Sequence, residues 1–121
     1  MYFTNTQKAA ILKAVSSIIV ADRHVHPLEM EFMNRVAAKL KIDSTVEGIA
    51  DDMNQDDTTQ AISSMDSAQK RLVAATIIGT MMADNKADFR ESATMGYIFE
   101  ECGLPRLSNA EYMNEVGYYF E

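Results

Sequence analysis

Basic residues are scarce in this chain of 121 residues. Lysine and arginine number 11, against 18 aspartates and glutamates, so the formal net charge is −7 at pH 7. A net negative charge repels phosphate backbones and anionic lipid headgroups. We therefore expect neither nucleic acid nor a membrane surface among the partners of this protein.

Long apolar stretches are lacking as well. The longest nearly apolar run covers residues 72–83, well short of the roughly 20 residues that span a bilayer. The first ten residues show no basic segment followed by an apolar run, so no secretory signal is visible. Cys102 is the only cysteine, which excludes an intramolecular disulfide. The sequence predicts a soluble, cytoplasmic protein, and its 47% apolar content suits a single domain over residues 1–121.

Signatures of catalysis are also missing from the sequence. The serines of the predicted helices lack the glycine-flanked turn that presents a nucleophilic serine. No glycine-rich phosphate loop is found, and the two histidines, His24 and His26, fall in one corner. We therefore expect a protein that is not an enzyme.

An internal repeat is the most informative pattern that is present. A shift of 62 positions aligns the residues from Thr4 onward with those from Asp66 onward, without a gap up to the last loop. The aligned apolar residues recur at spacings of three and four, which places them on one face of a helix. Aligned pairs include Ile11 with Val73, Val15 with Ile77, Asp22 with Asp84, Glu29 with Glu91, and Leu40 with Cys102.

Helix starts are marked by capping boxes, in which a Ser, Thr or Asp side chain and a Glu or Gln three residues later bond to each other's backbone. The boxes are Thr4 with Gln7, Ser44 with Glu47, Asp66 with Gln69, Asp88 with Glu91 and Ser108 with Glu111, with Asp57 and Gln60 as a further candidate. They predict helices near 5–22, 27–41, 45–53, 58–64, 67–84, 89–102 and 109–120.

These helices predict an all-α fold, a compact, orthogonal or irregular bundle of about seven helices without sustained strand patterns. The chain divides into a first repeat at about 4–53, a linker helix at about 54–65 and a second repeat at about 66–121. Neither three-helix repeat can bury its own apolar face in about 50 residues. We therefore expect the two repeats to pack together around a pseudo-twofold axis.

The two corners that follow the first helix of each repeat carry a shared motif. The segments read "ADRHVHPLE" at 21–29 and "ADNKADFRE" at 83–91. This pattern resembles the tellurite-resistance protein B (TerB-like) family, whose motif is roughly Ala-Asp-Gly-x-hydrophobic-Asp-x-x-Glu. Arg23 and Asn85 replace the glycine of that motif, and His26 replaces its second aspartate. The resemblance implies an all-helical domain with an acidic, cation-binding surface and a non-catalytic role in stress response or protein interaction.

The acidic corners admit two interpretations. Asp22 and Asp84 follow helix C-termini, where the helix dipole disfavours a carboxylate by roughly 0.3–1 kcal/mol. Each aspartate could accept backbone N–H bonds within its own corner, while Glu29 and Glu91 cap the next helix. Alternatively, the pseudo-twofold axis brings the four carboxylates together as ligands of one cation. Hard cations such as Ca²⁺ and Mg²⁺ prefer oxygen ligands of this kind.

Two neighbouring patterns extend this hypothesis only weakly. His26 and Asp88 are secondary candidate ligands, but zinc is less favoured than Ca²⁺ or Mg²⁺ because the second repeat offers no histidine. Residues 51–63 resemble the first half of an EF-hand. Asp57 occupies the position that needs glycine, and Ser63 that of the bidentate glutamate. An exposed acidic loop is the better interpretation.

The C-terminal residues Tyr118, Tyr119 and Phe120 cannot all face inward from one helix, so they form a candidate protein-binding surface. Three functions stay open at this point. The first is a TerB-like interaction or stress-response module with a divalent-cation site at the acidic corners. The second is a small metal-dependent hydrolase that uses the same carboxylates. The third is a purely structural helical module that binds another protein.

Overall fold

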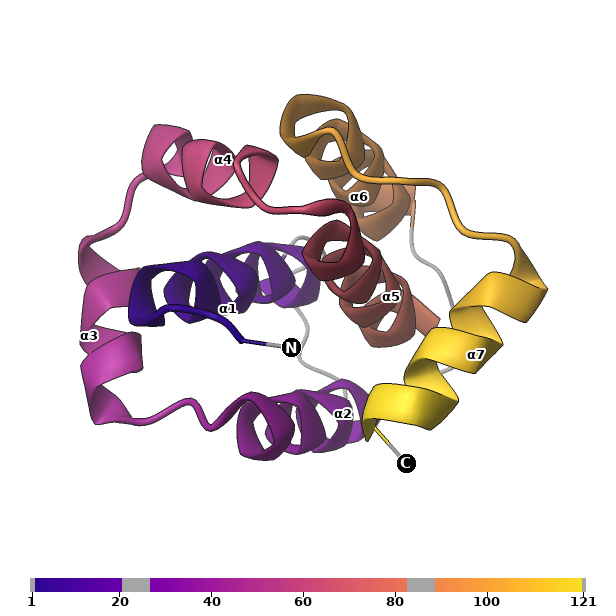
Figure 1. Cartoon of the computed structure of the whole chain (residues 1–121), viewed down its shortest axis with the longest axis horizontal. Coiled ribbons are helices and arrows are strands. Elements are labelled where there is room, and N and C mark those ends of the chain that lie inside the picture. Colours follow the sequence, from indigo (N-terminus) through magenta and orange to yellow (C-terminus); the bar gives the residue numbers. More distant parts are fainter. Residues whose placement is uncertain (1, 21–26, 83–88, 121) are drawn as a thin grey trace.

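The computed structural model describes residues 2–20, 27–82 and 89–120, and all regular structure in these ranges is α-helical (Figure 1). The all-α prediction is therefore confirmed, and the predicted order of helices agrees with the structure. The fourth helix begins three residues earlier than predicted. The helices are α1 (Asn5–Val20), α2 (Pro27–Leu40), α3 (Ser44–Asp52), α4 (Gln55–Ser63), α5 (Ser67–Met82), α6 (Phe89–Cys102) and α7 (Asn109–Phe120).

Two helices, α1 and α5, lie in the middle of the molecule and are surrounded by the others (Figure 1). Ten of the sixteen residues of α5 are buried, so side chains on every face of this helix contact protein. Such a position requires residues that are apolar or small all round the helix. Fully buried members of the core include Ile11, Val15 and Ile18 of α1 and Leu72, Val73 and Ile77 of α5.

Two buried polar side chains of α5 are satisfied within the helix itself. The hydroxyl of Thr76 donates to the carbonyl oxygen of Leu72, and the hydroxyl of Thr80 donates to that of Thr76, both at 2.8 Å. A buried hydroxyl without a partner would destabilise the fold by about 1–3 kcal/mol. The four-residue spacing removes that penalty, and α5 can therefore be central although it contains polar residues.

Several helix starts form the predicted capping boxes. At α1, α5 and α7 the reciprocal bonds link Thr4 with Gln7, Asp66 with Gln69, and Ser108 with Glu111. The starts of α3 and α4 differ from the prediction. Asp43, rather than Ser44, caps α3 by accepting the N–H of Val46, and α4 has a capping box of Asn54 and Asp57. The predicted capping pair for α4 is Asp57 with Gln60. The observed pair, Asn54 with Asp57, lies three residues earlier, and the helix therefore begins at Gln55.

The ends of α2 and α6 have the same geometry. Lys41 and Gly103 both adopt left-handed backbone conformations, with φ of 56° and 65°. In each case the next residue returns a hydrogen bond five residues back, from Ile42 to Ala37 at 2.9 Å and from Leu104 to Phe99 at 3.0 Å. This is the Schellman arrangement, which satisfies carbonyls at a helix end and normally uses glycine. Lys41 adopts this left-handed backbone conformation although its Cβ makes that conformation unfavourable.

The remaining helices pack around the two central ones. Helix α2 contacts α5, and α6 contacts α1. Between α2 and α5 the ring of Phe32 lies directly on Gly79, where an added Cβ would come within 2.4 Å of the ring atom Cζ. We call this contact region the α2–α5 groove; α7 contacts both of its helices. On the opposite side, α4 contacts both α1 and α6. Across the described ranges, every helix is too short or too polar to cross a membrane.

Candidate functional site

The acidic corners fall outside the part of the chain that the structure describes. Asp22, His26, Asp84 and Asp88 lie in segments 21–26 and 83–88, which are outside the described residues. Glu29 and Glu91 belong to the first turns of α2 and α6, but their side chains also lie outside the described set. The predicted cation ligands therefore stay predictions.

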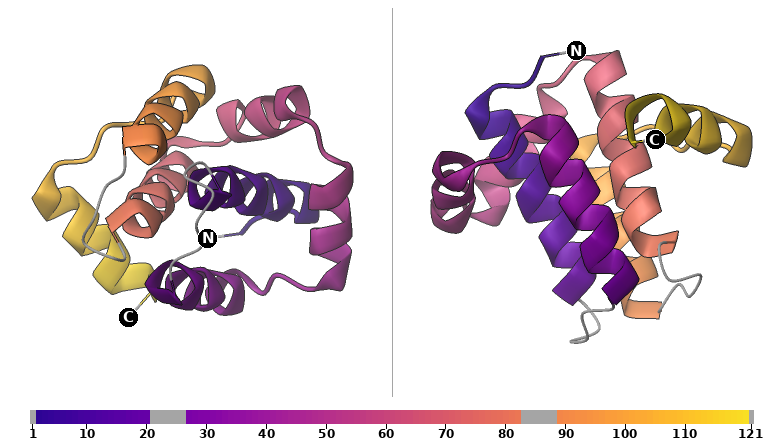
Figure 2. Two further views of the ribbon diagram at one scale, coloured as in Figure 1. Left: turned by 180° about the vertical axis from the view of Figure 1, so that it is seen from behind. Right: turned by 90° about the horizontal axis from the view of Figure 1, so that it is seen from below.

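The helix ends that flank these corners are described, and they lie at one end of the molecule. Helices α1 and α5 run in the same direction and end there, and α2 and α6 begin there (Figure 2, right). The connection from α1 to α2 contains Asp22, and the connection from α5 to α6 contains Asp84. Both acidic segments are thus joined to helix ends on the same side of the protein.

The described residues outside these corners contain no group of three or more His, Cys, Asp or Glu side chains that could hold a metal ion. The EF-hand-like stretch at 51–63 is also not an exposed loop, as expected from the sequence, but the end of α3 followed by α4. Asp57 accepts the N–H of Asn54 and Asn54 accepts that of Asp57. These carboxylate and amide oxygens serve as helix caps.

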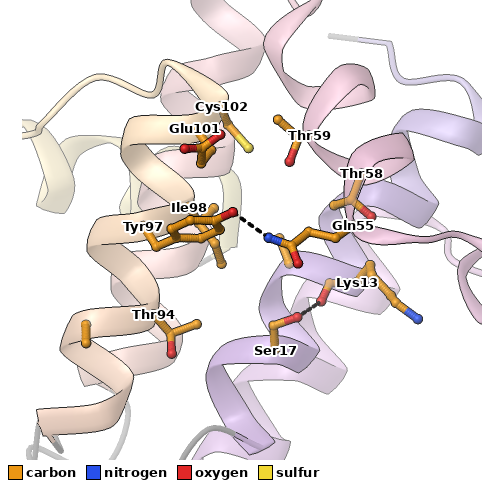
Figure 3. Close-up of a pocket in the computed structure, with 12 residues that line it drawn as sticks. Lys13, Ser17, Gln55, Thr58, Thr59, Thr94, Tyr97, Ile98, Glu101 and Cys102 are labelled. Carbon is orange, nitrogen blue, oxygen red and sulfur yellow. Dashed lines mark hydrogen bonds between the residues drawn. The ribbon is translucent and has the colours of Figure 1, made fainter.

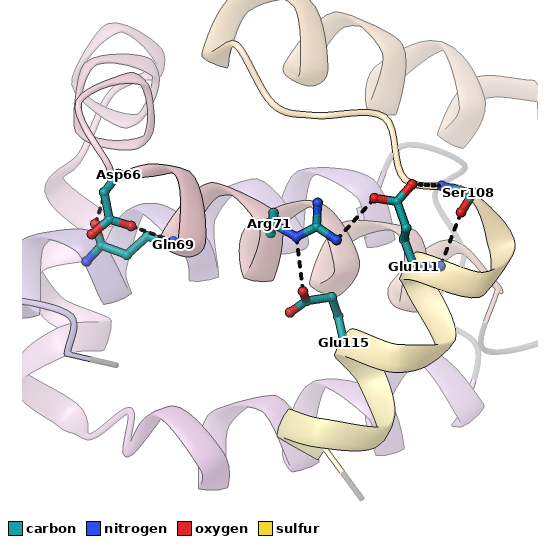
Figure 4. Close-up of polar contacts among 6 residues, drawn as sticks. All are labelled: Asp66, Gln69, Arg71, Ser108, Glu111 and Glu115. Carbon is teal, nitrogen blue, oxygen red and sulfur yellow. Dashed lines mark hydrogen bonds and ion pairs between the residues drawn. The ribbon is translucent and has the colours of Figure 1, made fainter.

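Helix α7 is attached to α5 by an ion-pair network. The guanidinium of Arg71 lies 3.1 Å from a carboxylate oxygen of Glu111 and 3.1 Å from one of Glu115 (Figure 4). Hydrogen bonds from Ser108, and then the pairing with Arg71, lower the pKa of Glu111. The two glutamates in turn raise the pKa of Arg71. The side chains of Tyr118, Tyr119 and Phe120, in the last turn of α7, lie outside the described set.

A cleft opens between α1, α4 and α6, with a volume of about 460 Å³ (Figure 3). We call it the α1–α6 cleft. Ala14 of α1 and Cys102 of α6 form buried parts of its wall, and the half-buried Ile98 adds apolar surface. Pockets that hold small molecules typically measure 300–1,000 Å³ and combine apolar walls with a few polar groups. The α1–α6 cleft has the size and the lining of such a pocket.

Polar groups lie at the mouth of the cleft. The side-chain amide of Gln55 on α4 donates to the hydroxyl of Tyr97 on α6 at 2.7 Å, a bond that spans the cleft (Figure 3). Both side chains are exposed; Tyr97 is 51% accessible. The bond uses the amide nitrogen of Gln55, so the amide oxygen can accept a hydrogen bond from a bound molecule. Lys13 and Glu101 add one charge of each sign to the lining.

Cys102 contributes a thiol to the wall of the cleft. Burial raises the pKa of this thiol, and a hydrogen bond with Thr59 opposes part of that shift. A thiol with a raised pKa is protonated at neutral pH and is a poor nucleophile. Cys102 therefore acts here as a small apolar group, as its position on a helical face predicts.

Sequence reasoning missed this cleft. Gln55 and Thr59 belong to α4, which the sequence predicts only as a linker helix, and Tyr97 is one of ten aromatic residues in the chain. One signal was available in the repeat alignment. Thr94 aligns with Phe32 and Ser17 with Gly79, so the second repeat lacks the ring that the first one carries. The alignment by itself does not show whether another side chain fills that space.

The arrangement of helices has a counterpart among solved structures. The crystal structure of a protein of unknown function from Porphyromonas gingivalis superposes with a TM-score of 0.81 at 27% sequence identity. The similarity covers 97% of this chain and 92% of that one. No family model matches the sequence, and no curated protein does. The likeness therefore concerns the helical arrangement as a whole.

Proposed function

We propose that the protein is a cytoplasmic, non-enzymatic interaction module of the TerB-like type that acts in stress response and holds a divalent cation between its two acidic corners. The observation that carries this proposal is the common position of four helix ends. The ends of α1 and α5 and the starts of α2 and α6 all lie at one end of the molecule (Figure 2). Both motif segments connect to these ends.

The internal repeat supports the same proposal. Gln7 and Gln69, which the 62-residue shift aligns, approach each other near the starts of α1 and α5, with 3.5 Å between the amide nitrogen of Gln69 and the side-chain oxygen of Gln7. A residue meets its own aligned partner only close to an axis that relates the two copies. The matching ends of α2 and α6, at Lys41 and Gly103, are consistent with two copies of one three-helix unit.

The proposed ligands are the repeated carboxylates Asp22, Glu29, Asp84 and Glu91, with Asp88 and His26 as secondary ligands. Four carboxylate oxygens suit Ca²⁺ or Mg²⁺, whose ligand distances are about 2.0–2.6 Å. Zinc would prefer nitrogen or sulfur ligands. A bound cation would also offset the repulsion between carboxylates that follow the negative ends of two helix dipoles.

Calorimetric titration of the metal-stripped protein with Ca²⁺, Mg²⁺ and Zn²⁺ tests this site. Saturable binding is expected for the wild type, and its loss is expected in the double variant Asp22→Asn, Asp84→Asn. The control is Asp51→Asn, Asp56→Asn, which removes the same charge from exposed positions on α3 and α4. If both double variants bind the cation equally well, the measured heat comes from nonspecific attraction between the cation and the negatively charged protein. No binding by the wild type would leave the corners as helix caps.

The proposed partner is another protein, and Tyr118, Tyr119 and Phe120 on α7 are the proposed contact residues. Aromatic side chains are enriched at protein interfaces because they bury a large area. Replacing all three with alanine is expected to abolish co-purification of the partner and to leave cation binding unchanged. A variant that still retains the partner would rule out this contact surface.

A further inference from the structure

The α1–α6 cleft and the α2–α5 groove occupy aligned positions in the two repeats. The 62-residue shift aligns Thr94 with Phe32, and Ser17 with Gly79. In the α2–α5 groove, Phe32 is 5% exposed, and its phenyl ring packs onto Gly79. In the α1–α6 cleft, Thr94 and Ser17 both line an open space instead. The cleft is therefore found where the other half of the molecule buries an aromatic ring.

The size of the cleft sets an approximate limit on what it can hold. A dry, apolar cavity of about 150 Å³ is sufficient to bind benzene. The α1–α6 cleft measures about 460 Å³ and is open to solvent on one side. A planar molecule of one or two rings fits such a space and leaves room for a polar substituent at the mouth.

The lining of the cleft indicates what kind of substituent it would accept. Gln55 and Tyr97 provide donor and acceptor groups at the mouth, and the half-buried Thr59 forms a side-chain hydrogen bond with Cys102 (Figure 3). Lys13 and Glu101 together add no net charge. The chain as a whole carries −7, which disfavours an anionic ligand. A neutral aromatic molecule with a hydrogen-bonding group is the class that agrees with both observations.

We propose that the α1–α6 cleft is a binding site for a small, neutral, planar aromatic molecule that carries a hydrogen-bonding group. The ring lies against Ala14, Ile98 and Cys102, and the polar group faces Gln55 and Tyr97. This site is separate from the acidic corners, and it does not depend on cation binding or on the interaction role. Its test and the calorimetric test of the corners can therefore fail independently.

Indole is the probe for this site, because it has two fused rings and a single N–H donor. Titration of the ¹⁵N-labelled protein with indole, followed by NMR, is expected to shift the amide signals of α1, α4 and α6 around the cleft. Saturation with a dissociation constant of about 1 mM or below corresponds to a specific contact for a ligand of this size. No saturation at concentrations several times higher would overturn the proposal.

Two filling variants approach the cleft from opposite walls. Thr94→Phe restores the ring that Phe32 supplies in the other repeat, and Ser17→Leu fills the same space from α1. Either change is expected to weaken indole binding by at least about tenfold, because the larger side chain occupies the space that indole would take. The matched control is Thr45→Phe on the exposed face of α3, which should bind as the wild type does. If one filling variant fails to fold, the other decides. Unchanged binding in a folded filling variant would reject the site.

A second titration separates a free molecule from a protein side chain as the source of the ring. An acetylated and amidated Gly-Trp-Gly peptide presents the same indole ring on a backbone. Free indole is expected to bind more tightly than the peptide, because the peptide backbone must also fit between Gln55 and Tyr97. Tighter binding of the peptide, again lost in Thr94→Phe, would replace the small-molecule proposal with a partner protein.

Discussion

The α2–α5 groove and the α1–α6 cleft are built from aligned helices but differ in how they are filled. In the groove, Phe32 supplies a buried ring and Gly79 supplies the space beneath it. In the cleft, threonine and serine occupy those positions and a volume of about 460 Å³ stays open. Their outer covers differ too, since α7 contacts the helices of the groove and α4 those of the cleft. At the aligned positions, one pair of side chains therefore fills the space between its helices with a ring, and the other pair lines an open cleft.

Removing the ring from the groove is expected to have the largest effect. Phe32→Ala should lower the free energy of unfolding by about 3–5 kcal/mol, because a buried ring is lost and a cavity is left. Thr94→Ala at the aligned position should lower it by about 1 kcal/mol or less, since the cleft is already open. Urea denaturation of both variants measures the difference. Equal losses would mean that the two sites are filled to the same extent.

A methyl group on Gly79 tests how closely the ring is packed. Gly79→Ala is expected to destabilise the protein by about 1–3 kcal/mol, because the new Cβ would lie 2.4 Å from Cζ of Phe32. In the Phe32→Ala background the sign should reverse, with a gain of about 1 kcal/mol from helix propensity. A double-mutant cycle measured by chemical denaturation gives the coupling. Additive effects of the two substitutions would show that Gly79 does not serve to admit the ring.

The ends of α2 and α6 provide a smaller test of the similarity between the two halves. Lys41→Gly should raise the free energy of unfolding by up to about 1 kcal/mol, because glycine adopts a positive φ without strain. Gly103→Ala should lower it by about 1 kcal/mol for the opposite reason. An added Cβ at Gly103 meets Lys70 only at 3.6 Å, an ordinary contact, so backbone strain alone is measured. Thermal unfolding of the two variants should shift in opposite directions.

The attachment of α7 beside the groove is expected to depend weakly on pH. The pKa of Glu111 is lowered in the folded state, so its contribution to stability is present above the unfolded pKa and is lost as the pH falls through the folded value. Glu111→Gln should therefore be less stable than the wild type at pH 7, and the difference should vanish well below pH 4.5, the ordinary glutamate value. Denaturation at both pH values measures this.

Glu100→Gln removes the same charge from an exposed part of α6 and is the matched control; at pH 7 it should be as stable as the wild type. High salt should reduce the effect at Glu111, since the pair with Arg71 is partly exposed. A loss of stability in Glu111→Gln that is equal at neutral and acid pH would assign the role of this residue to packing rather than charge.

Much of the fold could be predicted from the residues alone. Capping pairs such as Thr4 with Gln7 and Asp66 with Gln69 act over three residues, so a local pattern is enough to place a helix start. The exceptions have the same local origin. Asp43 competes with Ser44 for the start of α3, and several neighbouring acidic and amide residues can cap α4. The start of a helix is hard to predict from sequence wherever several adjacent residues can form the capping hydrogen bond.

The sequence by itself determined the all-α class and the order of the helices, because hydrophobic periodicity and helix caps are properties of neighbouring residues. Only the tertiary structure decided that four helix ends share one side of the molecule and that α4 lies across α1 and α6. It also decided that the space facing Thr94 is left open while that of Phe32 is filled. Whether the space between two helices is filled depends on side chains from three helices that are far apart in the chain. A pattern among neighbouring residues cannot predict how these side chains pack together.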